Sequence, residues 1–374
     1  MTARHVAIDV KNLALYSGGI AAHGRILIGG WLAARPEMRF SLVGPPFDSA
    51  FLDGVKNWRH VPVVWPEWLP RPLRHPYYDN ILFPRAVARL RPELLVSPYH
   101  DVRLPQASSG TRSVMMVHDT CLEDLPDLYP RRVRLYYLYM LGVNMSRAAH
   151  ILTLTRASRD AILRHYDVAP KRLSVLPSAV TLDFGPENVD PAAVAEARTR
   201  HGRSRILFYP SGSDARKNIG RLLEAFALLL ANSEDWGLLV TGDNDPGWSR
   251  HLVNVPEATR KRIEFLGRLD ERAVQTYYAA ADVVVYPTLC EGFGRLCLEA
   301  MRMGAPLACS DIPVLHEVAG GYPEYFDPFN IGAIADAICR ARNKGRRPPQ
   351  RDSRFDAEPV ARAFVSLMDG IVHG

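Results

Sequence analysis

Short apolar stretches rich in β-branched residues recur along the first half of the chain, with helix-like stretches between them. Seven of these stretches are predicted strands, at residues 6–10, 40–43, 61–64, 94–97, 113–118, 151–154 and 173–176. Buried-type strands that alternate with helices are typical of a parallel sheet with covering helices. The first half is therefore predicted to form one doubly wound α/β lobe.

The second half repeats this pattern after a polar interval that is poor in helix-forming residues. Its predicted strands are residues 206–209, 237–241, 263–266, 281–286 and 306–310. Between the two series a predicted strand ends at Pro177, and a proline at that place marks a turn or a crossing. We expect two lobes, residues 1–178 and 179–355, with a hinge near residue 178.

The last part of the chain contains a linker and one more helix. Residues 344–351 are rich in proline and charge, which indicates a linker. The helical spacing of the apolar residues that follow predicts a helix over 356–371, with Asp356 as its cap. These apolar residues are Val360, Phe364, Leu367 and Met368. Such a face needs a partner surface.

Length and composition narrow the class of protein. The chain has 374 residues, enough for two domains that each bury a core. No stretch approaches the roughly 20 apolar residues that span a bilayer. The segment after Met1 runs directly into a predicted strand and shows no signal peptide, so we expect a cytoplasmic protein. The five cysteines include no CxxC pair and give no support to a zinc site.

The net charge of +6 suits nucleic acid, an anionic membrane or phosphorylated small molecules, and its sign alone does not choose. One basic cluster, residues 131–134, is followed by aromatic and aliphatic residues at 135–140. This segment fits contact with an anionic leaflet such as the inner face of the cell membrane. It fits equally well a helix that packs its aromatic side chains inward and leaves its arginines in solvent.

The most informative stretch runs from residue 291 to residue 304. It follows a predicted strand, carries Glu291 on a loop with two glycines, and enters a short helix that holds Glu299 and ends at Gly304. Backbone NH groups at the start of such a helix bind anions. Two acids beside one anion-binding helix end suit a ligand with hydroxyls at both ends and phosphate in the middle, which is the shape of a nucleotide sugar.

Three further segments follow predicted strands and carry groups that suit phosphate or a sugar. Gly18 and Gly19 would let backbone NH groups approach a diphosphate, although a tight turn explains two glycines equally well. Lys217, one of six lysines, stands with Arg216 at a predicted helix entrance, either as a phosphate ligand or as a solvated residue. His118 ends a strand beside an acid, where doubly wound folds collect ligand groups.

Other patterns are weaker or absent. Glu299 also has a purely structural interpretation, because Arg295 and Arg302 are spaced for ion pairs along the same helix. The chain has neither a full GxGxxG nor a Walker lysine. Asp243 and Asp245 come nearest to a metal-binding DxD pair, and we interpret them as part of a loop near the nucleotide base. No metal site is predicted.

Together these segments resemble the retaining nucleotide-sugar glycosyltransferases of family 4, which have the two-lobed GT-B fold. The resemblance covers most of the chain and is strongest over residues 281–327. There the runs 291–294, 298–301, 304–306 and 310–320 are similar to the longest motif of the family. Three other segments stand where the family has its counterparts. They are the glycine pair at residues 18 and 19, the helix start at residues 216–218, and residues 155–159.

The resemblance implies a fold and a separate binding role for each of the two domains. The fold is α/β, with two Rossmann-like domains that face a central cleft and a C-terminal helix that crosses back to the first domain. Residues 1–178 with 356–374 would bind the acceptor, and residues 179–355 would bind the nucleotide-sugar donor.

By the same resemblance, Glu291 contacts hydroxyls of the donor sugar, Glu299 binds the ribose, and Lys217 neutralises the departing diphosphate. Many relatives have an arginine six positions before this lysine, but here the position is Ser211, so Arg216 would supply that part of the phosphate clamp. The implied catalytic residues are Glu291, His118 and Lys217. The implied donor-binding residues are Gly18, Gly19, Ser211, Arg216, Lys217, Gly292, Phe293, Gly294, Arg295 and Glu299.

We expect a metal-independent, retaining hexosyltransferase that needs no cofactor. GDP-mannose is favoured as the donor, because residues 211–218 are similar to those of mannosyltransferase relatives. The expected acceptor is a glycan or a polyprenyl-diphosphate-linked saccharide in cell-surface polysaccharide synthesis. The alternatives are a UDP-sugar-dependent transferase, a nucleotide-sugar epimerase, and an inactive partner protein that binds sugar nucleotides. No nucleic-acid partner is expected.

Overall fold

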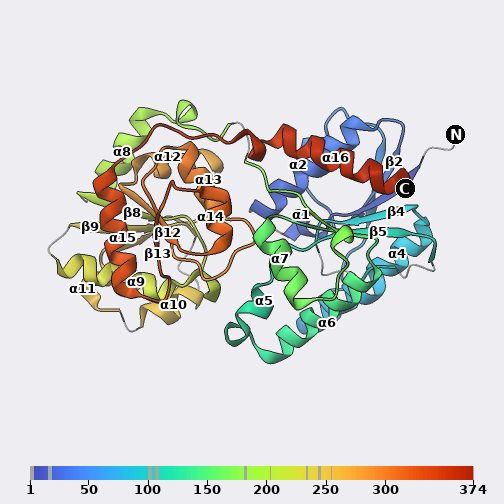
Figure 1. The fold of residues 1–374 in the computed structure, drawn as a ribbon, viewed down its shortest axis with the longest axis horizontal. Coiled ribbons are helices and arrows are strands. Elements are labelled where there is room, and N and C mark those ends of the chain that lie inside the picture. Colours follow the sequence, from blue (N-terminus) through green and yellow to red (C-terminus); the bar gives the residue numbers. More distant parts are fainter. Residues whose placement is uncertain are drawn as a thin grey trace. The chain divides into compact units, whose positions relative to one another are not determined.

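The first sheet has seven parallel strands in the order β3-β2-β1-β4-β5-β6-β7 (Figure 1). Strand β1 (His5–Asp9) pairs with β2 on one side and β4 on the other, so the strand order reverses there. The other strands are β2 (Arg39–Gly44), β3 (Trp58–Pro62), β4 (Leu94–Ser97), β5 (Arg112–Met116), β6 (His150–Thr153) and β7 (Leu173–Val175).

Helices cover both faces of this sheet, as the continuous apolar strands require. Ala7, Leu95 and Met115 pack with side chains of α4 and α6, whereas Ile8, Val96 and Val114 lie toward α2 and α16. Adjacent strand residues point to opposite faces, so both sides of each strand are buried. The helices are α1 (Lys11–Leu15), α2 (Gly19–Ala34), α3 (Arg71–Tyr77), the π-helical turn η2 (Tyr78–Leu82), α4 (Phe83–Leu90), α5 (Cys121–Asp124), α6 (Arg131–Arg147), α7 (Arg156–His165) and α16 (Ala357–His373).

The second sheet has six parallel strands in the order β10-β9-β8-β11-β12-β13, which is again a doubly wound arrangement. Its strands are β8 (Arg205–Tyr209), β9 (Trp236–Val240), β10 (Ile263–Phe265), β11 (Val283–Tyr286), β12 (Leu307–Ser310) and β13 (Glu324–Phe326). Its helices are α8 (Pro191–His201), α9 (Ile219–Ala231), α10 (Pro246–Leu252), α11 (Glu257–Arg260), α12 (Glu271–Ala280), α13 (Arg295–Arg302), α14 (Pro313–Ala319) and α15 (Ile331–Lys344).

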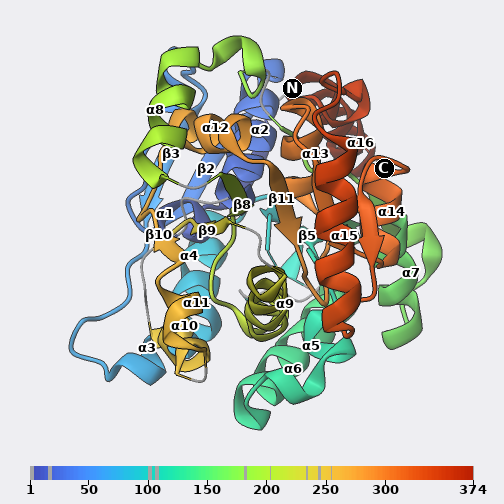
Figure 2. The same cartoon turned by 90° about the vertical axis from the view of Figure 1, so that its left-hand side faces the viewer.

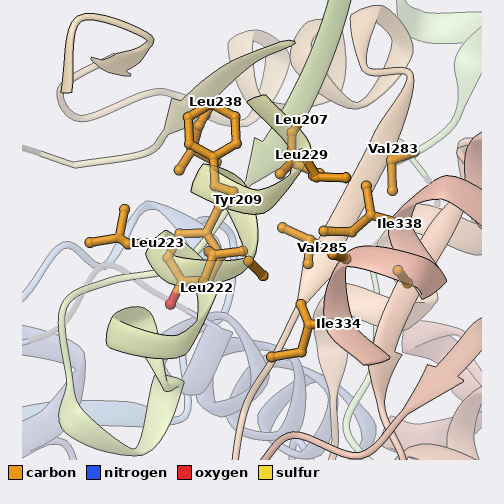
Figure 3. Close-up of a cluster of buried hydrophobic side chains, with 14 of the residues drawn as sticks. Leu207, Tyr209, Leu222, Leu223, Leu229, Leu238, Val283, Val285, Ile334 and Ile338 are labelled. Carbon is orange, nitrogen blue, oxygen red and sulfur yellow. The ribbon is translucent and has the colours of Figure 1, made fainter. Parts of the chain in front are cut away.

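One face of the second sheet is packed by α9 and α15. Figure 3 shows Leu222 and Leu229 of α9 and Ile338 of α15 in one cluster with strand residues such as Leu207 and Val283. All five side chains are almost completely buried. This core fixes the positions of β8 and β11, whose carboxyl ends carry the candidate site.

The computed structural model describes residues 4–15, 19–99, 103–105, 109–180, 183–202, 204–232, 235–242, 246–253 and 255–373. The chain divides into two compact units: Met1–Ala179 with Arg354–Gly374, called unit 1 below, and Val180–Ser353, called unit 2. Within these described ranges, no helix combines the length and the hydropathy needed to cross a bilayer.

The final helix belongs to unit 1, where α16 lies against α2 (Figure 1). Phe364 and Trp31 pack in a T-shaped arrangement, with a ring-centroid distance of 5.5 Å. A Cβ built on Gly30 would lie only 2.7 Å from the Cβ of Ala361, so the two helices approach more closely than a larger residue would allow. The prediction that the last helix packs back on the first domain is therefore confirmed.

Some predicted strand boundaries were wrong. β3 is Trp58–Pro62 and not 61–64, and β5 ends at Met116, two residues before the predicted end. The short strand β13 was not predicted, because its three residues include Glu324 and form no β-branched run. Tertiary pairing with β12 makes this segment a strand.

Candidate active site

The candidate site lies where the strand order of the second sheet reverses. Strands β8 and β11 are direct neighbours, with Val283 paired to Leu207. Parallel strands end at the same edge of a sheet, so the loops after β8 and after β11 meet there, and doubly wound folds bind ligands at this point. The loop after β8 carries Arg216 and Lys217, and the loop after β11 carries Glu291.

The central feature is one carboxylate held by two cations. Glu291 Oε1 accepts a hydrogen bond from Lys217 Nζ at 2.6 Å and another from Arg216 Nη1 at 2.7 Å. Only 11% of the Glu291 side chain and 12% of the Lys217 side chain are exposed. Two of the residues predicted to act on a donor sugar and its diphosphate are thus in direct contact.

One threonine hydroxyl and one tyrosine hydroxyl complete the cluster. Thr288, which is fully buried, donates from Oγ1 to Glu291 Oε1 at 2.9 Å. Lys217 Nζ also donates to the hydroxyl of Tyr286 at 3.2 Å and lies over its ring. Neither residue was predicted from the sequence. The one signal for them is that Tyr286 ends the apolar strand β11 and Thr288 follows it, before the Glu291 loop.

The backbone holds the two loops together. The 3-10 turn at Ala215–Lys217 is capped by Asp214, which accepts from the Arg216 NH at 3.0 Å. Leu289 NH donates to Arg216 O at 2.8 Å, so a backbone hydrogen bond links the two loops directly. Both loops that carry the charged side chains are therefore held by backbone hydrogen bonds.

Asn218 then starts α9 in the left-handed region, with φ of 60°. Asparagine tolerates this conformation better than most residues, because its short side chain can bond to nearby backbone. Its side-chain amide donates to Pro328 O at 2.7 Å and holds the helix entrance in place.

The two cations set the charge state of the carboxylate. Burial by itself would raise the pKa of Glu291, but the adjacent Lys217 and Arg216 outweigh it and lower the pKa to about 2. Burial and the nearby Glu291 raise the pKa of Tyr286 well above its ordinary value, so its hydroxyl stays neutral. The carboxylate is therefore ionised at neutral pH, whereas burial lowers the pKa of Lys217 from its ordinary value and the adjacent Glu291 opposes that shift.

Helix α13 begins immediately beyond this loop. Gly294 precedes its first residue with φ of 90°, and a Cβ there would lie 2.4 Å from Leu315 Cδ2 of α14. Only glycine fits both the conformation and the space. Gly292 lies in the same loop, and the Phe293 side chain is buried and anchors the loop.

Glu299 is buried on α13, where 7% of the residue is exposed. Its Oε1 accepts from Arg295 Nε at 2.8 Å, and its Oε2 accepts from the Tyr278 hydroxyl at 2.9 Å. The ion pair of Glu299 with Arg295, which the spacing along the helix predicted, is present. Tyr278 of α12 is a second partner of Glu299 that was not predicted. Each carboxylate oxygen has two lone pairs, so Glu299 retains capacity for further hydrogen bonds.

The remaining predicted residues fall in two places. Ser211 is buried in the loop after β8, in unit 2 with the charged cluster. His118 lies beyond the carboxyl end of β5 in unit 1, where Nε2 donates to Pro98 O at 2.8 Å and the ring stacks on Tyr99. Gly19 opens α2 and is exposed, also in unit 1.

Some predicted positions cannot be placed. Gly18 lies outside the described residues, as does the loop that holds Asp243 and Asp245. Among the side chains that are described, no group of three or more His, Cys, Asp or Glu residues is placed to hold a metal ion.

Family models match both halves of the chain. Residues 18–184 match the model described as Glycosyltransferase Family 4, and residues 203–344 match the model described as Glycosyl transferases group 1. The two matches leave few residues between them and reproduce the order expected of a two-lobed transferase.

Several solved structures share the whole fold. Sucrose-phosphate synthase from Thermosynechococcus elongatus superposes with a TM-score of 0.73 at 19% identity, covering 98% of this chain and 99% of that one. WaaG, a glycosyltransferase involved in lipopolysaccharide biosynthesis, gives a TM-score of 0.69 at 19% identity, covering 98% and 95%. The fold class predicted from the sequence, GT-B with two Rossmann-like sheets, is confirmed.

Sequence relatives give a more specific result. The chain is 30% identical over 267 residues to O-antigen chain mannosyltransferase B of Escherichia coli, covering 70% of this chain and 69% of the relative. It is 25% identical over 288 residues to the O-antigen chain mannosyltransferase RfbU of Salmonella typhimurium, covering 73% and 74%. With its fold, its two family matches and these relatives, the chain belongs to glycosyltransferase family 4.

Proposed function

We propose that this glycosyltransferase is a retaining, metal-independent hexosyltransferase that binds its nucleotide-sugar donor at the carboxyl edge of the second sheet. The observation that carries the proposal is the contact of Glu291 with Lys217 and Arg216 where β8 and β11 end. Two cations and one acid on adjacent loops match a ligand that offers a diphosphate next to a hydroxyl-bearing ring.

The cations would act on the leaving group. Cleavage of the bond between the anomeric carbon and the diphosphate oxygen places negative charge on the nucleotide. Lys217 and Arg216 lie on a loop that is hydrogen-bonded to the Glu291 loop, and they stabilise this charge from a fixed backbone. Backbone NH groups of Gly294 and Arg295 at the start of α13, in the loop of Gly292 and Phe293, add donors of the same kind. Ser211 lies in the same loop as Arg216 and Lys217.

The two acids would hold the sugar and the ribose. Glu291 accepts hydrogen bonds from hydroxyls of the transferred hexose, and Glu299 accepts from the ribose. His118, Gly18 and Gly19 belong to the first domain, to which we assign acceptor binding and contacts with the transferred sugar and diphosphate.

Retention of configuration is proposed to follow front-face displacement. The acceptor oxygen bonds to the anomeric carbon on the face from which the diphosphate leaves, and the acceptor proton passes to the departing phosphate oxygen. A glycosyl adduct trapped on Glu291 would instead indicate a double displacement of the kind that retaining glycosidases use.

Mannose from GDP-mannose is the proposed donor substrate, supported by the relatives named as O-antigen mannosyltransferases. A glycan or a polyprenyl-diphosphate-linked saccharide is the proposed acceptor, in cell-surface polysaccharide synthesis at the cytoplasmic face of the membrane. The donor is a substrate, and no separate cofactor is proposed.

The test is a transfer assay with the purified chain, GDP-mannose or a UDP-hexose, and a synthetic polyprenyl-diphosphate-linked saccharide. We expect GDP-mannose to be consumed only with acceptor, and the product linkage to keep the anomeric configuration of the donor in an NMR spectrum. An isomer formed from donor alone would indicate an epimerase. Thermal stabilisation by a nucleotide sugar without any turnover would indicate an inactive binding partner.

A further inference from the structure

Unit 1 contains a cavity that none of the residues discussed so far as donor or sugar ligands lines. Its volume is about 620 Å³, within the range of about 300–1,000 Å³ that is usual for small-molecule sites. We name it the α4–α6 cavity, and its lining residues lie within 80–93, 103–105 and 109–111, together with Arg147. The helices α4 and α6, light blue and blue-green in Figure 2, pack on the same face of the first sheet.

The charged part of this cavity lies away from the ligand groups of unit 1. Arg91 precedes β4 and Arg147 precedes β6, so both stand at the amino edge of the sheet, where parallel strands begin. His118 follows β5 and therefore stands at the opposite, carboxyl edge, where doubly wound folds bind their substrates. The α4–α6 cavity is thus separate from the candidate active site.

Three arginines from different elements line the cavity. Arg91 follows α4, Arg103 belongs to the segment between β4 and β5, and Arg147 is the last residue of α6. Within the part of the chain that the structure describes, none of the three forms an ion pair. Glu93 is the one acid among the described lining residues, and its carboxylate accepts a hydrogen bond from the His5 NH at 3.4 Å. The cavity therefore has an excess of positive charge.

Hydrogen bonds hold two of these arginines near each other. Arg147 Nη1 donates to Leu104 O at 2.9 Å, and the Leu104 NH donates to Asn144 Oδ1 at 3.0 Å. The Arg103 NH donates to Asp79 O at 3.0 Å. Burial lowers the pKa of Arg147, and the nearby Arg103 lowers it further. Two like charges that the backbone keeps close together repel each other, and an anion bound between them would offset that repulsion.

Arg91 has a backbone conformation that most side chains disfavour. It follows the last residue of α4 in the left-handed region, with φ of 47° and ψ of 54°. Glycine is the usual residue where a helix ends in this conformation, because a Cβ is strained there. Helix capping therefore does not explain an arginine at this position, whereas a ligand for its guanidinium group does.

Apolar side chains form another part of the cavity wall. Val87 and Leu104 are almost completely buried, and Pro84 and Pro105 line the same space. A phosphate group has three terminal oxygens and up to two negative charges, which suits three guanidinium groups better than a carboxylate does. The apolar wall is complementary to an organic group attached to that phosphate.

We propose that the α4–α6 cavity binds a water-soluble organic phosphate. Arg91, Arg103 and Arg147 hold the phosphate group, and the organic part of the ligand packs against the apolar wall. The proposal depends neither on the donor nor on the acceptor of the transfer reaction, because none of these residues belongs to the candidate active site.

The test is isothermal titration calorimetry of the full chain with mannose 6-phosphate and with inorganic phosphate, at constant ionic strength. We expect both to bind, mannose 6-phosphate more tightly, and unphosphorylated mannose not to bind in this cavity. Arg103→Gln should raise the Kd for mannose 6-phosphate at least about tenfold, the effect of one charge-assisted hydrogen bond. No hydrogen bond or ion pair of the Arg103 side chain exists among the described residues, so this variant should keep the fold.

Arg91→Gly separates ligand binding from stability. Glycine adopts the left-handed conformation freely, so the melting temperature of the free chain should not fall, whereas the Kd for mannose 6-phosphate should rise about tenfold. Arg200→Gln in unit 2 is the matched control, because it removes the charge of one exposed arginine. This control and Lys217→Ala in the candidate active site should both bind mannose 6-phosphate as the wild type does.

Chemical modification locates the bound phosphate without any variant. Phenylglyoxal reacts with accessible guanidinium groups, and mass spectrometry identifies the modified arginines. Mannose 6-phosphate should slow the modification of Arg103 and Arg147 and leave that of Arg200 unchanged.

Three outcomes would overturn the proposal: a wild type that binds neither phosphate, an equal loss of affinity in Arg200→Gln, or binding that is lost in Lys217→Ala and kept in Arg103→Gln. The last result would place the phosphate in the candidate active site. Protection of Arg103 and Arg147 in a chain that transfers no sugar would refute the proposed function and leave the cavity site standing.

Discussion

Lys217 Nζ donates to Glu291 Oε1 at 2.6 Å, although 74 residues separate them along the chain. The acid proposed to hold the donor sugar therefore neutralises a cation proposed to hold the donor diphosphate. A bound diphosphate would replace this carboxylate as the partner of Lys217 and Arg216. The exchange leaves Glu291 available for sugar hydroxyls, and it makes the pair testable by several independent measurements.

Removing either partner should abolish transfer. Lys217→Ala and Glu291→Ala are each expected to reduce kcat at least about a hundredfold, the usual loss when one preorganised charge-stabilising group is deleted. Circular dichroism should show the fold intact. Lys261→Ala is the matched control, because that lysine is exposed on the surface of the same unit and pairs with Glu257. Near-normal turnover in either site variant would exclude the proposed site.

Neutralising Glu291 should separate binding from catalysis. In Glu291→Gln the two cations lose their internal carboxylate, so GDP should bind more tightly, by about tenfold, the value of one charge-assisted hydrogen bond. Transfer should nevertheless fall to background. Isothermal titration with GDP measures the first effect, and Glu257→Gln serves as the control. Weaker GDP binding in Glu291→Gln would mean that the carboxylate only positions the cations and does not compete with the diphosphate.

The stability of the folded chain should depend on pH through Glu291. The pKa of Glu291 falls from an ordinary value of 4.5 to about 2 in the folded chain, so folding favours its ionised form. This contribution, on the order of 3 kcal/mol, is complete above about pH 4.5 and is lost as the pH falls through about 2. Melting curves across that window should therefore fall more steeply for the wild type than for Glu291→Gln. Parallel curves would contradict the ion pair.

A side chain at Gly294 should destabilise the fold. Alanine there would combine φ of 90° with a Cβ that lies 2.4 Å from Leu315 Cδ2. We expect Gly294→Ala to lower the free energy of unfolding by about 2 kcal/mol, measured by urea denaturation. Gly321→Ala is the control, since nothing lies within 4 Å of a Cβ at that glycine and its φ is not in the left-handed region. Equal stability of the two variants would show that the loop before α13 adapts.

Thr288 should act as a positioning residue. Thr288→Val keeps the shape of this fully buried side chain but removes the hydroxyl that donates to Glu291 Oε1 at 2.9 Å. We expect kcat to fall about tenfold with little change in KM, since a donor bond to a charged group contributes about 1.5–3 kcal/mol. Thr288→Ser should restore most of the loss. Failure of serine to rescue would assign the effect to packing.

Several features of the fold could be predicted from local pattern. Apolar runs such as 94–97 and 206–209 are strands, because both faces of a parallel sheet are buried and leave no polar alternation. The spacing of Val360, Phe364 and Met368 predicted a helix, and these side chains are buried on α16. Boundaries such as those of β3 and β5 could not be predicted, because register with neighbouring strands decides where a strand ends.

Some features of the candidate site could also be predicted from the sequence, and others could not. The residue types of Glu291, Glu299 and Lys217, and their places after strands or on a helix, were visible in the sequence. The partners of these side chains were not. Thr288, Tyr286 and Tyr278 carry no motif that marks them as functional, and they became apparent only through hydrogen bonds to the acids and the lysine.

The sequence by itself determined the α/β class, the two sheets and the family, because periodic burial and short motifs are local properties of the chain. Tertiary structure decided the rest. It brought the loops after β8 and β11 together at the strand reversal, lowered the pKa of Glu291 through two cations 74 and 75 residues away, and turned Leu135 and Tyr139 of α6 outward while Tyr136 faces inward. Contacts between distant residues and the burial they produce exist only in the folded chain, and charge states and exposed surfaces follow from them.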